Sequence, residues 1–147
     1  VVQLDAEAAP LSVSRFAQLA GAGAFDGVAF HRVIPDFVAQ TGAGIETPSE
    51  PLRTEVTRIP FTNGPRGRQR VFGVARETER HTETTQFFIT HSMQPHLDGG
   101  YTSLGWVVEG QDVLDRVLPW QVIERAEIRP QPVSAAMGAR RAPRNPR

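Results

Sequence analysis

The sequence predicts a mainly β fold in which two helices pack on an antiparallel barrel or sandwich. Many short apolar runs have the length of strands, only two segments have helical periodicity, and 13 Gly and 12 Pro divide the chain into short elements. The 147 residues suffice for one domain with a single core. We expect that domain over residues 1–129 and a disordered Arg- and Pro-rich tail over residues 130–147, because the tail has no core-forming pattern.

The first expected helix begins at Pro10, because proline lacks the N–H that a first helical turn leaves unpaired, and it ends near Gly21. Its apolar face, spaced i, i+3, i+4 and i+7, consists of Val13, Phe16, Ala17 and Ala20. A second, shorter helix is expected over residues 112–118. Its apolar side consists of Val113, Leu114, Val117 and Leu118.

Strands are expected where apolar residues run or alternate between turn signals. The predicted ranges are 1–4, 29–34, 37–40, 71–75, 86–90, 106–108 and 122–128. Pro35-Asp36 separates the second range from the third, and Asp98-Gly99-Gly100 is a strong turn signal. Alternation directs Phe30, Phe87 and Ile89 to the core. Residues 42–70, rich in Gly, Pro, Thr and Arg, are expected to form a long excursion.

The composition excludes several classes of chemistry. The chain has no Cys and no Lys, which rules out disulfides, thiolate catalysis and Schiff-base lysines. Sixteen Arg balance sixteen acidic residues, so the net charge indicates neither a nucleic-acid nor a membrane partner. No apolar run reaches the roughly 20 residues of a membrane span. We therefore expect a soluble protein, with the cytoplasm as the favoured compartment, although the start at Val1 leaves a removed upstream segment open.

Two segments of the sequence carry a family resemblance. The first is FDGVAFHRVIPDFVAQ at residues 25–40, and the second is QFFIT at 86–90, continued by PHLDGGY at 95–101 and LGWVVEG at 104–110. Together they resemble the cyclophilins, the cyclosporin-binding family of peptidyl-prolyl cis/trans isomerases. The match extends over about residues 1–128, and the loop between Ala75 and Gln86 has the length seen in bacterial members.

The resemblance implies a closed antiparallel eight-stranded β-barrel capped by two α-helices, with the active groove on its outer surface. Members usually begin with a strand that forms a hairpin with the one matched here by Val1–Leu4. The resemblance therefore implies that the first strand of the barrel is missing from this chain.

The resemblance also assigns site residues position by position. Arg32 is similar to the catalytic arginine, and Phe37 and Gln40 complete the catalytic set. The implied substrate-binding residues are Val38, Ala75, Arg76, Gln86, Phe88, His96, Leu97 and Tyr101.

The implied roles differ along the groove. The walls of the proline pocket are Phe37, Val38, Phe88 and Leu97. Gln40 and Gln86 bind the substrate backbone, and Ala75 and Arg76 lie where the family binds the residue before proline. Val38 replaces a more usual methionine, and His96 replaces the tryptophan or phenylalanine that often borders the pocket. We therefore expect cyclosporin to bind only weakly.

These residue types suit rotation about an X–Pro bond. The barrier of about 18–20 kcal/mol arises because the nitrogen lone pair is delocalised into the carbonyl. Twisting the bond returns that lone pair to the prolyl nitrogen, where a permanently charged donor such as Arg32 can stabilise it. Such a catalyst needs no cofactor. We also expect no metal site, because His81, His91 and His96 lie in loops without acidic residues at ligand spacing.

We expect a monomeric peptidyl-prolyl isomerase whose partners are proline-containing peptides or unfolded proteins and which assists their folding. The alternative is a noncatalytic module that binds proline peptides within a larger protein. A third hypothesis is an RNA-associated β-domain that uses the arginines of residues 66–70 and of the tail. No aromatic residues are interleaved with these arginines, and such runs more often belong to solvated loops. We therefore expect no nucleic-acid partner.

Overall fold

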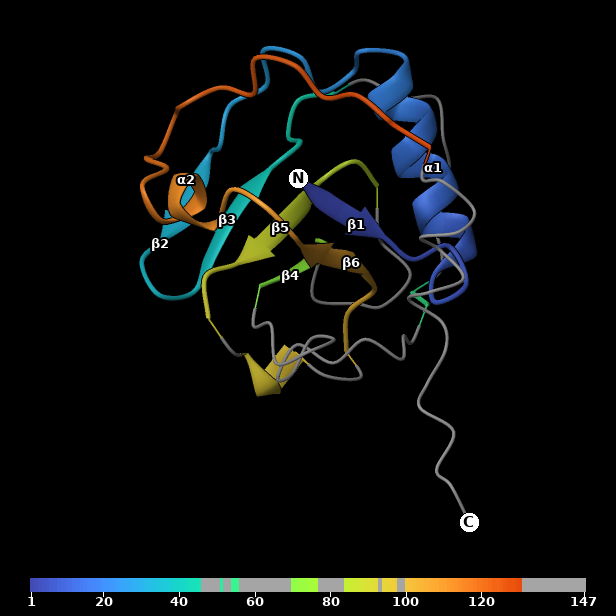
Figure 1. Cartoon of the computed structure of the whole chain (residues 1–147), viewed down its shortest axis with the longest axis horizontal. Helices are drawn as coiled ribbons and strands as arrows, with labels where there is room; N and C mark the ends of the chain where they lie inside the picture. The colour runs from blue at the N-terminus through green and yellow to red at the C-terminus, as the bar shows by residue number, and fades with distance from the viewer. Residues whose placement is uncertain are drawn as a thin grey trace.

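Six antiparallel strands form one sheet in the order β1-β6-β4-β5-β3-β2 (Figure 1). The computed structural model describes residues 1–45, 51, 54–55, 70–76, 84–92, 94–97 and 100–130. The strands are β1 (Val2–Leu4), β2 (Arg32–Ile34), β3 (Val38–Thr41), β4 (Val71–Val74), β5 (Phe87–Thr90) and β6 (Ser103–Val107). The helical elements are α1 (Pro10–Gly21), α2 (Gln111–Asp115) and the 3-10 turn η2 (Pro95–Leu97). The prediction of a mainly β antiparallel fold with two α-helices is confirmed.

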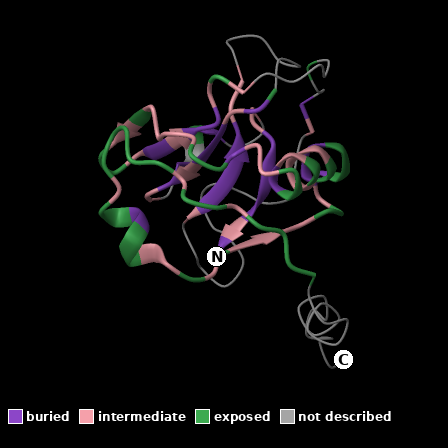
Figure 2. Ribbon diagram, turned by 90° about the horizontal axis from the view of Figure 1, so that it is seen from above, coloured by how far each residue is buried: buried purple, intermediate pink, exposed green. Residues whose placement is uncertain are grey.

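Helix α1 closes the larger core. It lies at one side of the strands and α2 at the other (Figure 1). Phe16 of α1 packs its ring against three others, with centroids 5.1 Å from Phe25, 4.9 Å from Phe72 and 5.3 Å from Phe87. Figure 2 shows the buried residues gathered on the strands beneath α1, whose outer face is exposed. The predicted apolar face of this helix is confirmed at Val13 and Ala20, which are both buried.

The predicted second helix is shorter than expected. It ends at Asp115, and of its predicted apolar side only Leu114 is buried, whereas Val113 and Leu118 are each 61% exposed. A helix of about one and a half turns cannot turn four apolar residues toward one core. The predicted apolar side is therefore confirmed at Leu114 and the half-buried Val117, which pack in one cluster, and is wrong at Val113 and Leu118.

The predicted closing strand over residues 122–128 is also wrong. Val122 forms only an isolated bridge with Ala29, and Val122 and Ile128 are 54% and 42% exposed. The chain runs beside residues 27–30, with Ile123 N–H donating to the Val28 carbonyl at 2.9 Å. Beyond that point the partner segment turns at Phe25-Asp26-Gly27, so no extended backbone remains for a ladder.

Other boundaries shift without changing the type of element. β2 begins at Arg32 rather than residue 29, and β6 begins at Ser103 rather than residue 106. Most of the 42–70 excursion, Asp98-Gly99 and the tail from residue 131 lie outside the described residues. Within the described residues, no helix is long and apolar enough to cross a bilayer.

Two tight turns share one sequence signature. In Pro35-Asp36 and Pro119-Trp120 the residue after proline has positive φ, 58° at Asp36 and 71° at Trp120. Each turn is closed by a backbone hydrogen bond, from Phe37 N–H to the Ile34 carbonyl at 3.1 Å and from the Gln121 N–H to the Leu118 carbonyl at 3.2 Å. This is the pattern of a type II turn, whose third position suits glycine and tolerates Asp far better than Trp.

Replacing Trp120 by glycine should stabilise the protein. A left-handed conformation costs an L-residue about 1–2 kcal/mol, which glycine would avoid. Glycine also gives the unfolded chain more conformational freedom, and this cancels part of the gain. Because the Trp120 side chain is 70% exposed, little packing is lost. We expect Trp120→Gly to raise the free energy of unfolding in urea by about 0.5–1 kcal/mol. A decrease would show that the indole packs on the fold.

Candidate functional site

Nine of the eleven predicted site residues line one cavity of about 120 Å³. They come from β2, β3, the end of β4, β5, η2 and the chain entering β6. The lining residues are Arg32, Phe37, Val38, Gln40, Ala75, Arg76, Phe88, Leu97 and Tyr101. The other two, Gln86 and His96, contact lining residues from outside the cavity. The structure therefore brings together residues that lie up to 69 positions apart in the sequence, from Arg32 to Tyr101.

The floor of the cavity is apolar and buried. Val38, Phe88 and Leu97 are 3%, 4% and 6% exposed and pack in one cluster. The Tyr101 ring meets the Phe88 ring edge-on, with centroids 5.8 Å apart. Successive side chains of a strand point to opposite faces, so Phe87 enters the α1 core while Phe88 faces the cavity. The prediction that Phe87 is a core residue is confirmed.

One edge of the cavity is a chain of three polar side chains. Arg32 on β2 lies opposite Gln40 on β3, and its Nη1 donates to Gln40 Oε1 at 3.1 Å. Gln40 Nε2 in turn donates to Gln86 Oε1 at 2.9 Å. These two bonds fix the orientation of the Gln40 amide and hold the exposed guanidinium of Arg32 at the cavity.

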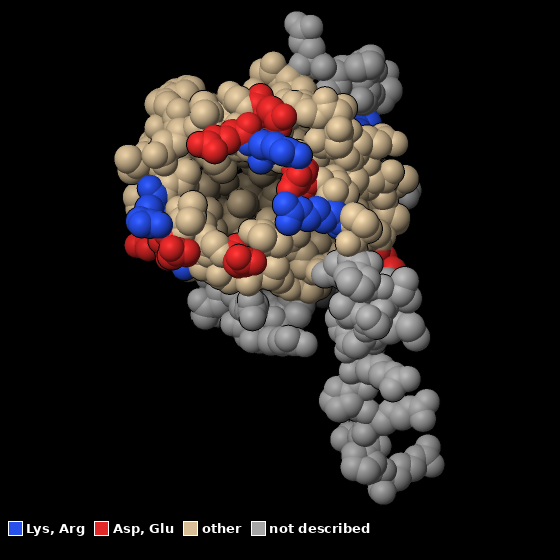
Figure 3. Space-filling view, turned by 45° about the horizontal axis from the view of Figure 1, so that its top comes forward, with Lys and Arg blue, Asp and Glu red and all other residues tan. Residues whose placement is uncertain are grey.

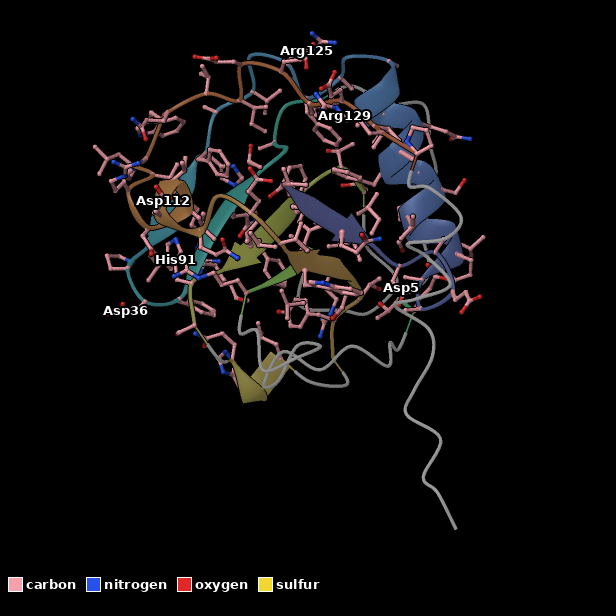
Figure 4. The ribbon with its side chains drawn as sticks, viewed as in Figure 1. Asp5, Asp36, His91, Asp112, Arg125 and Arg129 are labelled. Carbon is pink, nitrogen blue, oxygen red and sulfur yellow. The ribbon has the colours of Figure 1, made fainter. Side chains whose placement is uncertain are left out.

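The ring of Phe37 is positioned by the turn before it. The carbonyl of Phe37 accepts the His91 N–H at 2.8 Å. The carbonyl of Asp36 accepts Ser92 Oγ at 2.7 Å and Gln94 Nε2 at 3.1 Å. Figure 4 shows Asp36 and His91 at the same end of the molecule.

Sequence reasoning did not identify Ser92 and Gln94, which lie in the gap between residues 86–90 and 95–101 of the second motif. Neither side chain belongs to the cavity lining; both act through the Asp36 carbonyl that precedes Phe37. Their one visible signal was that both are polar and lie within four residues of the end of an apolar strand.

The opposite edge carries a second arginine. The Arg76 guanidinium lies over the Tyr101 ring, with Cζ 4.4 Å from the ring centroid, and its Nε donates to the Gly100 carbonyl at 2.7 Å. Stacking on an aromatic ring suits the planar, weakly hydrated guanidinium. Arg76 and Arg32 thus bound the cavity on opposite sides of its apolar floor.

Gly42 permits the close approach that places Gln86 beside Gln40. It follows β3 with φ +89°, and a Cβ at this position would lie 2.4 Å from the Thr85 carbonyl oxygen. Thr85 Oγ1 donates to the Gly42 carbonyl at 2.7 Å, so the two backbones are held together just before Gln86.

Alanine at Gly42 should be costly, and Gly44 provides a matched control. Gly44 also has positive φ, but a Cβ there meets no atom of the described residues within 4 Å. Both variants carry the cost of positive φ, and only Gly42→Ala adds the backbone clash. We expect Gly42→Ala to lose about 1–3 kcal/mol more unfolding free energy in urea than Gly44→Ala. Equal losses would contradict the close approach.

Comparison with known proteins identifies the family. The family described as "Cyclophilin type peptidyl-prolyl cis-trans isomerase/CLD" matches residues 1–134. This chain belongs to the cyclophilins. Peptidyl-prolyl cis-trans isomerase B of Bacillus subtilis is 34% identical over 130 residues, which cover 86% of this chain and 87% of that protein.

The cyclophilin chain is similar to proteins of very different length. A probable peptidyl-prolyl cis-trans isomerase of Brucella suis is 34% identical, and the match covers 79% of this chain and 64% of that protein. Peptidyl-prolyl cis-trans isomerase-like 2 of Cryptococcus neoformans is 39% identical, but the match covers 88% of this chain and only 22% of that protein. This chain therefore spans about a fifth of the length of the Cryptococcus relative.

Solved structures support the cyclophilin fold. The crystal structure of a Cryptosporidium parvum cyclophilin, determined in the presence of the dipeptide Ala-Pro, has a TM-score of 0.76 and 21% identity to this chain. The alignment covers 88% of this chain and 92% of that one. The resemblance inferred from residues 25–40 and 86–110 is confirmed.

Proposed function

We propose that this cyclophilin catalyses cis/trans isomerisation of X–Pro bonds in unfolded or flexible protein segments and so assists their folding. The observation that carries the proposal is the guanidinium of Arg32, held by Gln40 at the edge of an apolar cavity. Family membership supports the same activity.

The apolar floor would hold the pyrrolidine ring. Phe37, Val38 and Phe88 offer the ring a surface without hydrogen-bonding groups, so the proline is fixed while the acyl side remains free to rotate. Cis and trans X–Pro bonds differ by only about 0.5–1 kcal/mol, and exchange is slow because of the barrier between them. Catalysis therefore requires tighter binding of the twisted state than of either planar state.

Arg32 would supply that difference in binding. As the bond twists, the prolyl nitrogen regains its lone pair and becomes a hydrogen-bond acceptor, which a guanidinium N–H can stabilise. Because Gln40 and Gln86 already orient Arg32, little reorganisation is needed during the reaction. The remaining capacity of the two amides would bind the substrate backbone. Arg76, Ala75 and Tyr101 would receive the residue before proline.

Removing the guanidinium should abolish most of the catalysis without unfolding the protein. We expect Arg32→Ala to lower kcat/KM at least about tenfold, measured by NMR exchange spectroscopy on an Ala-Pro peptide. Arg32→Lys keeps the charge but loses the planar group that Gln40 orients, so it should recover only part of the rate.

Arg125→Ala is the matched control. Arg125 is an exposed arginine that pairs with Glu127, and Figure 4 shows it at the other end of the molecule from Asp36. This variant should retain the parent rate. Full activity in Arg32→Ala would refute the role of Arg32.

We further propose that cyclosporin binds this site weakly. The His96 ring is exposed beside Phe37, with centroids 5.6 Å apart, and offers less apolar area than a tryptophan. His96→Trp should therefore tighten cyclosporin binding about three- to tenfold in calorimetry. Gln18→Trp, at an exposed position on α1, is the control. Equal affinity of His96→Trp and the parent would contradict this reading.

A noncatalytic module that binds proline peptides is the second candidate. In the Cryptococcus relative the matching part is only 22% of the protein, so a domain similar to this chain occurs there within a longer chain. Peptide binding without acceleration of exchange by the folded chain would identify this function.

Apart from Arg70, the arginines on which the RNA hypothesis rests lie outside the described residues, and the described arginines give it little support. Arg116, Arg125 and Arg129 each pair with a carboxylate. Figure 3 shows basic and acidic side chains next to one another on the face that it displays. Arg70 hydrogen-bonds Asp115 at 2.9 Å and holds the pKa of that carboxyl below its ordinary value. Charge of mixed sign does not favour a polyanion.

We also propose the finer architecture implied by the family. The sheet would correspond to the family's eight-stranded barrel with its first strand missing from this chain, and the pairing of residues 27–30 with 121–123 supports this by continuing the sheet beyond β2. The domain would extend over residues 1–129, with 130–147 as a tail. A monomer in the cytoplasm stays our prediction for its state and compartment.

A further inference from the structure

Trp120 is an exposed aromatic residue in a position that suits glycine. It is the third residue of the turn formed by residues 118–121, with φ 71°, and 70% of its surface is exposed. Within the described residues, no aromatic pair includes its ring. The fold therefore gains little from this side chain, and its backbone conformation is unfavourable for it. Such a strained position at the surface is typical of a residue retained for binding.

The backbone of Trp120 is hydrogen-bonded to the segment that leads into β2, the strand that carries Arg32. Its N–H donates to the Phe30 carbonyl at 2.8 Å, and Phe30 N–H donates to the Gln121 carbonyl at 2.8 Å. Phe30 precedes Arg32 by two residues, and two residues of extended chain span at most about 7 Å. The long indole side chain thus begins within reach of the cavity edge formed by Arg32.

The order of the strands gives the direction in which a substrate would cross the site. Ala75 follows β4, the cavity floor comes from β5 and β3, and Arg32 lies on β2. With about 4.8 Å between neighbouring strands, β4 and β2 lie about 14 Å apart. The segment containing Trp120 lies one strand spacing further. The Ala29 carbonyl accepts a hydrogen bond from Thr41 Oγ1 on one side, and Ala29 forms a β-bridge with Val122 on the other.

We propose that Trp120 forms a subsite of the groove that binds an apolar or aromatic side chain two residues after the substrate proline. The inference rests on the proposed function, in which the residue before proline lies at the Ala75 end and the chain leaves past Arg32. If the substrate proline lies over β5 and β3, an extended chain advances about 3.3 Å per residue from there. The second residue after proline then lies beside β2, within reach of the indole. Leu118, 61% exposed in the same turn, extends the apolar surface.

The test compares two peptides that differ at one position. Ala-Ala-Pro-Ala-Phe-Ala has phenylalanine two residues after proline, and Ala-Ala-Pro-Ala-Ala-Ala has alanine there. By NMR exchange spectroscopy, we expect the parent chain to act on the phenylalanine peptide with a kcat/KM about two- to tenfold higher. Trp120→Gly, which suits the turn, should reduce this ratio to about one, and Trp120→Phe should restore most of it.

Leu11→Ala is the matched control, because Leu11 is 48% exposed on α1 and should leave the ratio unchanged. A ratio of one in the parent, or an unchanged ratio in Trp120→Gly, would overturn the subsite. If Arg32-dependent acceleration persists in that case, the proposed function stands and only the subsite fails. Absence of acceleration with both peptides would instead refute the isomerase.

A binding measurement decides the subsite even without catalysis. The chain has two Trp, so its NMR spectrum has two indole N–H signals, and the one lost in Trp120→Gly belongs to Trp120. This signal should shift with the phenylalanine peptide and much less with the alanine peptide. Equal shifts with both peptides would overturn the proposal. A shift that depends on protein concentration without peptide would indicate a contact between two copies and would also overturn it.

Discussion

The antiparallel register of β2, β3 and β5 is the constraint on which the candidate site depends. It sets Arg32 opposite Gln40 and Gln40 opposite Phe88, so the guanidinium, the amide and the apolar floor lie in one row across three strands. A slip of one residue would exchange the two faces of a strand, moving Phe88 to the α1 core and Phe87 to the cavity. The packing of Phe87 between Phe16, Phe25 and Phe72 resists that slip. The core beneath α1 therefore maintains the geometry of the site.

Tight backbone features secure the register at both ends of β3. Before it, the Pro35-Asp36 turn is held by Ser92 and Gln94, which follow β5. After it, Gly42 approaches the backbone of Thr85, which precedes β5. Each pair ties β3 to β5 at one end, and neither involves a residue of the cavity lining. The proposed catalytic side chains thus belong to strands whose relative position is determined by groups outside the cavity.

The two type II turns show how the same backbone geometry can serve different purposes. Asp36 tolerates positive φ, and its turn is bonded into the fold on the side of Phe37. Trp120 has a similar φ, and within the described part of the chain its exposed side chain has no aromatic partner. The Trp120 turn therefore differs from the Asp36 turn in carrying backbone strain that the fold does not require. Its hydrogen bond to Phe30 places the turn next to the β2 side of the site.

The sequence by itself determined the family, the class of fold, α1 and the side chains of the candidate site. Two long motifs in the right order and spacing identified the family and the site, and strand alternation separated Phe87 from Phe88. Only the tertiary structure decided where the chain stops pairing and which apolar residues remain exposed. Residues 122–128 alternate like a strand, yet the segment that would pair with them is no longer extended beyond Gly27. The sequence of α2 has an apolar side, yet the helix is too short to bury all of it. The contacts of Ser92 and Gln94 with Asp36, and of Trp120 with Phe30, join groups 56 to 90 residues apart, and local periodicity contains no information about such partners.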